Sequence, residues 1–119
     1  MAKGFLTTHV LDTARGVPVA GLVIDLFVIE ADQRNHIRSL PTNSDGRTDG
    51  QILPAAEFST GTCELVFHAG DYLDRLEKTA KAIRFLDVIP IRFGITDVDS
   101  HYHVPLLLSP FGYSTYRGS

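Results

Sequence analysis

The 119-residue sequence has only one cysteine, Cys63, so an intrachain disulfide is excluded. It also has no excess of positive charge, because 11 lysines and arginines stand against 14 acidic residues, giving a formal net charge of −3. Domains that bind nucleic acid usually carry a basic patch, so nucleic acid is not an expected partner. No apolar run approaches the roughly 18 residues that cross a bilayer as a helix, so no membrane partner is expected either.

Several recognisable motifs are missing as well. The first ten residues, MAKGFLTTHV, lack the apolar core of a signal peptide, and the chain does not end in the peroxisomal Ser-Lys-Leu. With a single cysteine, these absences favour a soluble cytoplasmic protein. There is no glycine-rich phosphate loop and no G-x-S-x-G motif, and the alternation around Cys63 predicts a small buried hydrophobe rather than a nucleophile.

Short alternating segments separated by turn signals predict an all-β sandwich, formed by one domain over residues 1–119. The segment that begins at Gly70 and Asp71 predicts the one convincing helix, with Asp71 as its N-cap. The expected strands are Phe5–Asp12, Gly21–Glu30, His36–Leu40, Gln51–Leu53, Thr62–Ala69, Val88–Thr96, His101–Leu108 and Tyr113–Arg117.

The C-terminal segment HYHVPLLLSPFGYSTYRGS carries the strongest functional signal. At a period of two its apolar residues Tyr102, Val104, Leu106 and Leu108 face the core, and the opposite face presents His101, His103, Pro105 and Leu107. The first strand likewise places His9 and Leu11 together on one face. A solvated edge hairpin is the ordinary interpretation of such a segment. The leucines beside the histidines instead favour a surface that another molecule covers.

The outward-facing polar groups suggest water activation against a polarised carbonyl. His9 and His103 could take or give protons near neutral pH, and Arg47 could hold a carbonyl or anionic oxygen. Arg47 lies in the loop PTNSDGRTDG, where a solvated arginine is the commoner case, although rigidly held loops also concentrate functional groups. Ser114 and Tyr116 share one face of the last strand and are candidate substrate-binding residues.

A zinc site is an alternative use of the same histidines. His101 and His103 on one strand face, with His9, could supply three nitrogen ligands. A His-x-His pair in a strand is a weak signal, however, and no acidic residue lies in an obvious completing position. We therefore expect neither a metal nor a cofactor.

Four blocks of sequence resemble the 5-hydroxyisourate hydrolases, the enzyme branch of the transthyretin-like family. They are THVLDTARGVPV (residues 8–19), SDGR (44–47), PIRF (90–93) and the C-terminal segment with its final Tyr-Arg-Gly-Ser. The resemblance covers essentially the whole chain. It implies a transthyretin-like sandwich of two four-stranded sheets with one short helix, assembled as a homotetramer whose channel is lined by the outer faces of the first strand and the C-terminal hairpin.

The same resemblance implies the reaction and the residues that carry it. Water would add to a ring carbonyl of 5-hydroxyisourate, a small-molecule substrate, and a C–N bond would open to give 2-oxo-4-hydroxy-4-carboxy-5-ureidoimidazoline. The family's functional residues correspond to His9, Arg47, His103, Tyr116 and Ser119. The alternative is a transthyretin-like binding protein without catalysis, but that branch lacks this set of residues, all of which stand here. The division of roles between the two histidines stays open, and Pro105 in an interior strand predicts a bulge or an N position facing away from the ladder.

Overall fold

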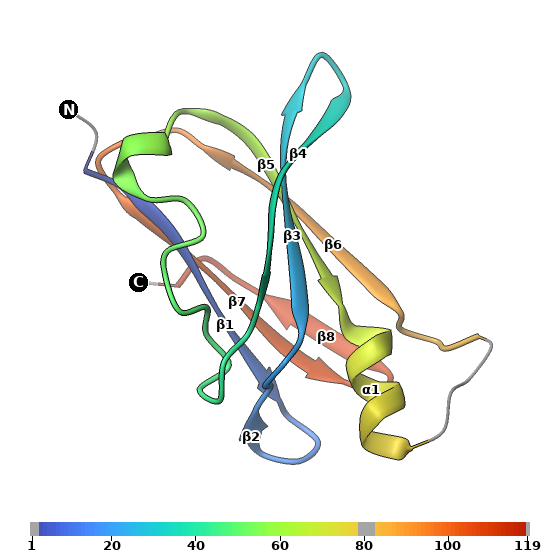
Figure 1. Cartoon of the computed structure of the whole chain (residues 1–119). Coiled ribbons are helices and arrows are strands. Elements are labelled where there is room, and N and C mark those ends of the chain that lie inside the picture. Colours follow the sequence, from blue (N-terminus) through green and yellow to red (C-terminus); the bar gives the residue numbers. More distant parts are fainter. Residues whose placement is uncertain (1–2, 79–82, 119) are drawn as a thin grey trace.

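The computed structural model describes residues 3–78 and 83–118. Its strands and helices follow one another along the chain as shown in Figure 1. The elements are β1 (Phe5–Asp12), β2 (Val17–Pro18), β3 (Val23–Glu30), β4 (Gln33–Pro41), the 3₁₀ turn η1 (Ala55–Glu57), β5 (Gly61–His68), α1 (Ala69–Glu77), β6 (Val88–Ile95), β7 (His101–Ser109) and β8 (Gly112–Thr115).

The strands form two four-stranded sheets, which confirms the predicted fold class. One sheet has the order β2-β1-β7-β8 and the other the order β4-β3-β5-β6. All neighbours are antiparallel except β1 and β7, which run parallel from opposite ends of the sequence. The two sheets lie as separate layers, and the β3–β4 hairpin extends past the rest of the sandwich in Figure 1.

The core lies between the sheets and follows from the period-two alternation. In β1 every second residue is buried, and in β7 the four predicted inward residues are all at most 6% exposed. Cys63 is buried as predicted, and burial raises the pKa of its thiol. The fully buried side chains from both layers include Leu6, Val10, Ile24, Leu26, Leu65, Phe67, Leu106 and Leu108.

Four predicted strands were wrong by two or more residues at one end or did not form, and three others, β5, β6 and β7, differ by a single residue at one or both ends. β4 begins at Gln33 rather than His36, because positive φ at Ala31 and Asp32 closes a tight hairpin and Gln33 pairs at once with Glu30. β3 begins two residues later than predicted, at Val23. The expected strand Gln51–Leu53 makes only an isolated bridge, from Leu53 to Leu6. β8 covers Gly112–Thr115 rather than Tyr113–Arg117.

The helix prediction was correct in place but wrong in its cap. α1 begins at Ala69, its N-cap is His68 without a side-chain cap bond, and Asp71 lies inside the first turn. The helix packs at the Asp12 end of β1, where the Tyr72 hydroxyl donates to Asp12 over 2.9 Å. Burial and this carboxylate together raise the pKa of Tyr72 to about 12.

The outer face of the second sheet is less open than its alternation predicts. The alternation of the predicted strand Thr62–Ala69 places Glu64 and Val66 outward, yet they are only 6% and 4% exposed. The Glu64 carboxylate is covered by the guanidinium groups of Arg34 and Arg92, with N···O distances of 3.1 and 3.0 Å. Long side chains from the neighbouring strands therefore cover this face, which a period-two pattern cannot show.

No helix within residues 3–78 and 83–118 is long and apolar enough to cross a membrane.

Candidate active site

The parallel pairing of β1 with β7 brings the predicted histidines onto one face of one sheet. In this register Thr7 lies opposite His103, His9 opposite Pro105, and Leu11 opposite Leu107. Residues directly opposite in a ladder share a face, so His9 and His103 are diagonal neighbours on the side away from the core. Two segments almost a hundred residues apart thus form a single surface.

The loop that carries Arg47 is fixed by Asn43 and attached to β1. The Asn43 side-chain oxygen accepts the backbone N–H groups of Asp45 and Arg47, and its amide donates to Asp49. Gly46 has a φ of +75°, and its carbonyl accepts the backbone N–H of Val10 over 2.8 Å. A β-carbon at Gly46 would clash with the Val10 carbonyl oxygen and lie 3.3 Å from the ring of His9. Only glycine therefore allows this loop to approach the histidine so closely.

The end of the chain returns to the same face and lies against His103. The Gly118 N–H donates to the His103 carbonyl over 2.8 Å, in the register that pairs Leu106 with Thr115. A β-carbon at Gly118 would stand only 2.6 Å from Cδ2 of the His103 ring. The contact between the chain end and the His103 strand is thus made by the backbone of Gly118. Ser119, the predicted catalytic hydroxyl, lies outside the described residues.

Pro105 interrupts the hairpin rather than bulging it. The β1–β7 ladder runs through Pro105 without a register shift. The carbonyl of Pro105 accepts the Thr115 hydroxyl of β8, so the nitrogen also points toward β8. Of the two predicted alternatives, no bulge forms, and the nitrogen faces away from the continuous β1–β7 ladder, as the second alternative expects. The missing N–H lies between the Leu106–Thr115 pair, where the β8 ladder ends, and the bridge at Gly118.

Thr7 holds both histidines of β7. Its hydroxyl lies 2.8 Å from Nδ1 of His103 and 2.6 Å from Nε2 of His101. The ring of His101 also stacks on Phe5, with centroids 4.1 Å apart. Burial, followed by the positive charges of Arg47, His101 and His9, lowers the pKa of His103 below its usual value. This lowered pKa favours the neutral imidazole, the form that accepts a proton.

An open cleft of about 420 Å³ joins these groups. Its lining includes Arg47, His101 and His103, together with Thr7 and the loop residues 48–51. Tyr116 contributes instead to a groove between β6 and β8 and is 59% exposed. Ser114 lies beside Leu107 in the hairpin and is absent from the cleft lining. The structure thus gathers His103 and Arg47 in the cleft with His9 nearby, and it leaves Tyr116 and Ser114 outside.

One ring nitrogen of each β7 histidine belongs to a hydrogen-bonded cluster. Nε2 of His101 and Nδ1 of His103 both face the Thr7 hydroxyl. In the part of the chain that the structure describes, no group of three or more histidine, cysteine or acidic side chains is arranged to hold a metal ion.

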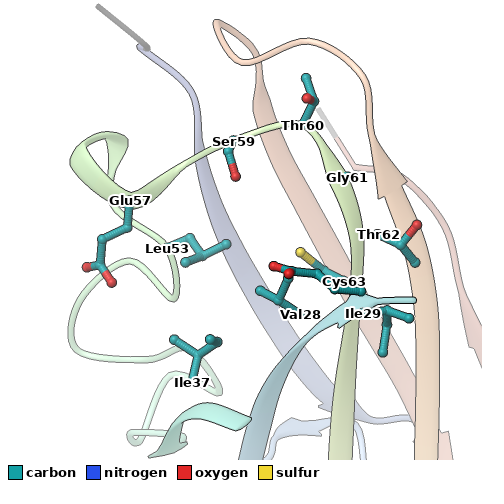
Figure 2. A pocket seen from close by; sticks show the side chains of 11 residues that line it. Val28, Ile29, Ile37, Leu53, Glu57, Ser59, Thr60, Gly61, Thr62 and Cys63 are labelled. Carbon is teal, nitrogen blue, oxygen red and sulfur yellow. The ribbon is translucent and has the colours of Figure 1, made fainter. Parts of the chain in front are cut away.

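A separate pocket of about 210 Å³ lies at the junction of β3, β5 and the segment around η1 (Figure 2). Val28, Leu53 and Cys63 line its apolar side, and Glu57 lies at its rim with Ser59 and Thr60. None of the predicted site residues contributes to it.

Comparison with known proteins identifies the family of this chain. The model of the HIUase/Transthyretin family matches residues 6–118. The chain belongs to the HIUase/Transthyretin family. The matched span contains both histidine strands, the Arg47 loop and the tail up to Gly118.

Relatives within the family share the whole length of the chain. The protein described as 5-hydroxyisourate hydrolase 2 of Rhizobium meliloti (strain 1021) is 62% identical over 117 residues, which cover 98% of each chain. The solved structure of Klebsiella pneumoniae 5-hydroxyisourate hydrolase is 31% identical, with a TM-score of 0.80, and covers 98% of this chain and 99% of its own. An (S)-allantoin synthase structure is 43% identical with a TM-score of 0.88, and the match covers 99% of this chain but 44% of that chain.

Two residues that shape the candidate site were missed from the sequence. Thr7 was read only as part of an alternating strand, since its role depends on a partner strand 96 residues away. Asn43 was read as a generic loop residue, although an asparagine four residues before Arg47 could have signalled a side chain that organises the turn. His101 also lines the cleft, next to the histidine that was singled out.

Proposed function

We propose that this protein hydrolyses 5-hydroxyisourate to 2-oxo-4-hydroxy-4-carboxy-5-ureidoimidazoline, a step of urate degradation. The observation that carries the proposal is the meeting of three distant segments on one surface: the His9 strand, the Arg47 loop and the strand of His103. Full-length relatives described as 5-hydroxyisourate hydrolases support the same substrate.

The proposed chemistry needs a base, an electrophilic partner for the carbonyl, and a proton for the leaving nitrogen. Arg47 would hold the ring carbonyl oxygen, where negative charge develops as water adds. A histidine would take the water proton as the new C–O bond forms, and would return it to the ring nitrogen as the C–N bond breaks. His103 suits the task of taking the water proton, since its lowered pKa favours the neutral imidazole. His9 is the second candidate for either proton transfer.

The chain end would complete the cleft. Gly118 reaches the ring of His103, and Ser119 follows it directly in the sequence. Ser119 would therefore supply a hydroxyl to the substrate or the attacking water, whereas Tyr116 and Ser114, which lie outside the cleft lining, are given no contact with the substrate. This scheme uses amino-acid side chains alone and requires no cofactor or metal.

We also propose that the working form is a cytoplasmic homotetramer. Leu11 and Leu107 are opposite each other in the ladder, on the same outward face as the histidines. Both side chains are only partly buried. An apolar surface of this kind is stabilised by a partner, and a second pair of subunits would turn the open cleft into a wall of a shared channel.

Steady-state kinetics with freshly prepared 5-hydroxyisourate test the function. His9→Ala and Arg47→Ala should each lower the rate by at least roughly a hundredfold, the scale of a general base or a carbonyl-polarising donor. Melting temperatures should stay near that of the parent protein, because both side chains lie outside the core. His36→Ala and Arg38→Ala are matched controls, since these side chains pair with Ser39 and Glu57. Near-parental rates for both site variants would refute the assignment.

A further inference from the structure

We infer that Thr7 is a positioning residue that links His101 to His103 as a proton relay behind the reacting nitrogen. The inference rests on the proposed function and assigns a task to two residues of the cleft that the proposed reaction leaves idle.

Thr7 and the two histidines of β7 form a short series of hydrogen bonds. Nδ1 of His103, the Thr7 hydroxyl and Nε2 of His101 follow one another at 2.8 and 2.6 Å, both within ordinary hydrogen-bonding range. The two rings are 5.8 Å apart and tilted by 55°, so the hydroxyl between them is their link. Each ring is also held from β1, because Thr7 is paired with His103 in the ladder and Phe5 with His101.

The hydroxyl restricts the protonation states of the two rings. It carries a single hydrogen, so it can donate to only one of the two nitrogens and must accept from the other if both hydrogen bonds are kept. At least one ring therefore presents an N–H to Thr7. In one arrangement Nδ1–H of His103 donates to Thr7 and Thr7 donates to His101, which leaves Nε2 of His103 bare and able to act as a base.

Proton transfer through this series of hydrogen bonds would leave His103 uncharged after it accepts a proton. When Nε2 takes a proton from water, the Nδ1 proton passes to the Thr7 oxygen, and the original Thr7 proton passes to Nε2 of His101. At His103 one N–H bond has formed and one has broken, and Thr7 has exchanged one O–H bond for another. His101 has gained one N–H bond, one water O–H bond has broken, and the positive charge therefore lies on His101. The reverse sequence returns a proton from His103 Nε2 to the leaving nitrogen.

The surroundings of the two rings favour this direction. His103 is disfavoured as a cation by burial and by the neighbouring charge of Arg47, which is the origin of its lowered pKa. Further charge near it comes from His101 and His9. His101 instead stacks on the face of Phe5, and an aromatic face attracts a positive charge.

A set of three variants tests the relay. Thr7→Val keeps the β-branched shape and removes the hydroxyl, while Thr7→Ser keeps the hydroxyl. Thr7→Val should lower kcat at least tenfold, toward the roughly hundredfold scale of acid–base catalysis, with KM changed less than about twofold. Thr7→Ser should restore most of kcat. Thr13→Val is the control, because it removes a hydroxyl that bonds only a backbone carbonyl at the far end of β1.

Two further readouts separate a relay from a merely structural role. Nitrogen NMR of labelled histidines should show one dominant tautomer of His103 in the parent protein and a mixture in Thr7→Val. His101→Leu should lower kcat as Thr7→Val does, and the double variant should be no slower than either single variant, since the residues act as one unit.

These experiments distinguish a failure of the Thr7 relay from a failure of the proposed function. A parent protein that does not hydrolyse 5-hydroxyisourate would refute the function itself. An active parent with an undiminished Thr7→Val, with a Thr7→Ser no faster than Thr7→Val, or with additive losses in the double variant would overturn the relay alone.

Discussion

Replacement of Gly118 by alanine probes the contact between the chain end and the site. The backbone at Gly118 does not lie in the left-handed region, so alanine fits the main chain without strain. Its β-carbon, however, would stand 2.6 Å from Cδ2 of His103. Carbon atoms in contact are separated by about 3.5–4.0 Å, so the ring or the tail must move by about 1 Å.

We expect Gly118→Ala to lower the catalytic rate and to leave the stability of the protein nearly unchanged. A ring that moves about 1 Å away from the tail changes the direction of Nε2 and stretches or bends the 2.8 Å bond from Nδ1 to Thr7. A displacement of about 1 Å at a reacting group typically costs about a hundredfold in rate. The free energy of unfolding should change by less than about 0.5 kcal/mol, as for other substitutions outside the core.

The assay compares initial rates of 5-hydroxyisourate hydrolysis and melting curves for three proteins. Gly112→Ala is the matched control, because it lies in the same hairpin and its β-carbon would approach only Ser109, at 3.6 Å. We expect parental activity from Gly112→Ala and a loss of ten- to a hundredfold from Gly118→Ala, with similar melting temperatures for all three. Full activity of Gly118→Ala would refute the claim that the tail fixes the His103 ring.

Three further predictions follow from the charges and the outer surface of the site. Arg47→Gln should raise the pKa of His103 in an NMR titration, because removing a nearby positive charge stabilises the imidazolium form. Arg47→Lys keeps the charge and should keep the pKa low. An unchanged pKa in Arg47→Gln would contradict the electrostatic coupling between Arg47 and His103. Leu107→Glu should lower both the mass measured by light scattering and the hydrolysis rate, because it places a charge on the proposed interface, and a fully active smaller species would refute the shared channel. Dialysis against a strong chelator should leave the rate unchanged, since the proposed reaction uses side chains alone and Thr7 already engages Nε2 of His101 and Nδ1 of His103. Activity that is lost and then restored by zinc would favour the three-histidine metal site.

The sandwich was predictable because its strands carry their own pattern. β1 matched the predicted bounds Phe5–Asp12, and in β7 the four inward side chains were assigned correctly from alternation alone. The predictions that failed concern features that are set by residues on other strands. The start of β4 is set by a hairpin with β3, and the burial of Glu64 is set by two arginines from other strands.

The candidate site likewise has a part that could be predicted from the sequence and a part that could not. His9, His103 and Arg47 could be named because their residue types are costly to place on an apolar surface or in a glycine-rich loop without a purpose. Their arrangement could not be derived, since it depends on the parallel pairing of β1 with β7 and on the contact of Gly46 with Val10. The role of Thr7 is invisible in the sequence for the same reason, because its two partners lie on β7.

The measurement that tests the central claim most directly is the fate of a large molar excess of 5-hydroxyisourate mixed with a trace of protein. The substrate is generated from urate in the cuvette, and its decay is followed against the spontaneous reaction. An enzyme consumes all of it at an initial rate proportional to protein concentration, and the Arg47→Ala variant loses most of that rate. Decay at the spontaneous rate, or an effect that stops once one molecule is bound per chain, would show a binding protein instead and contradict the account.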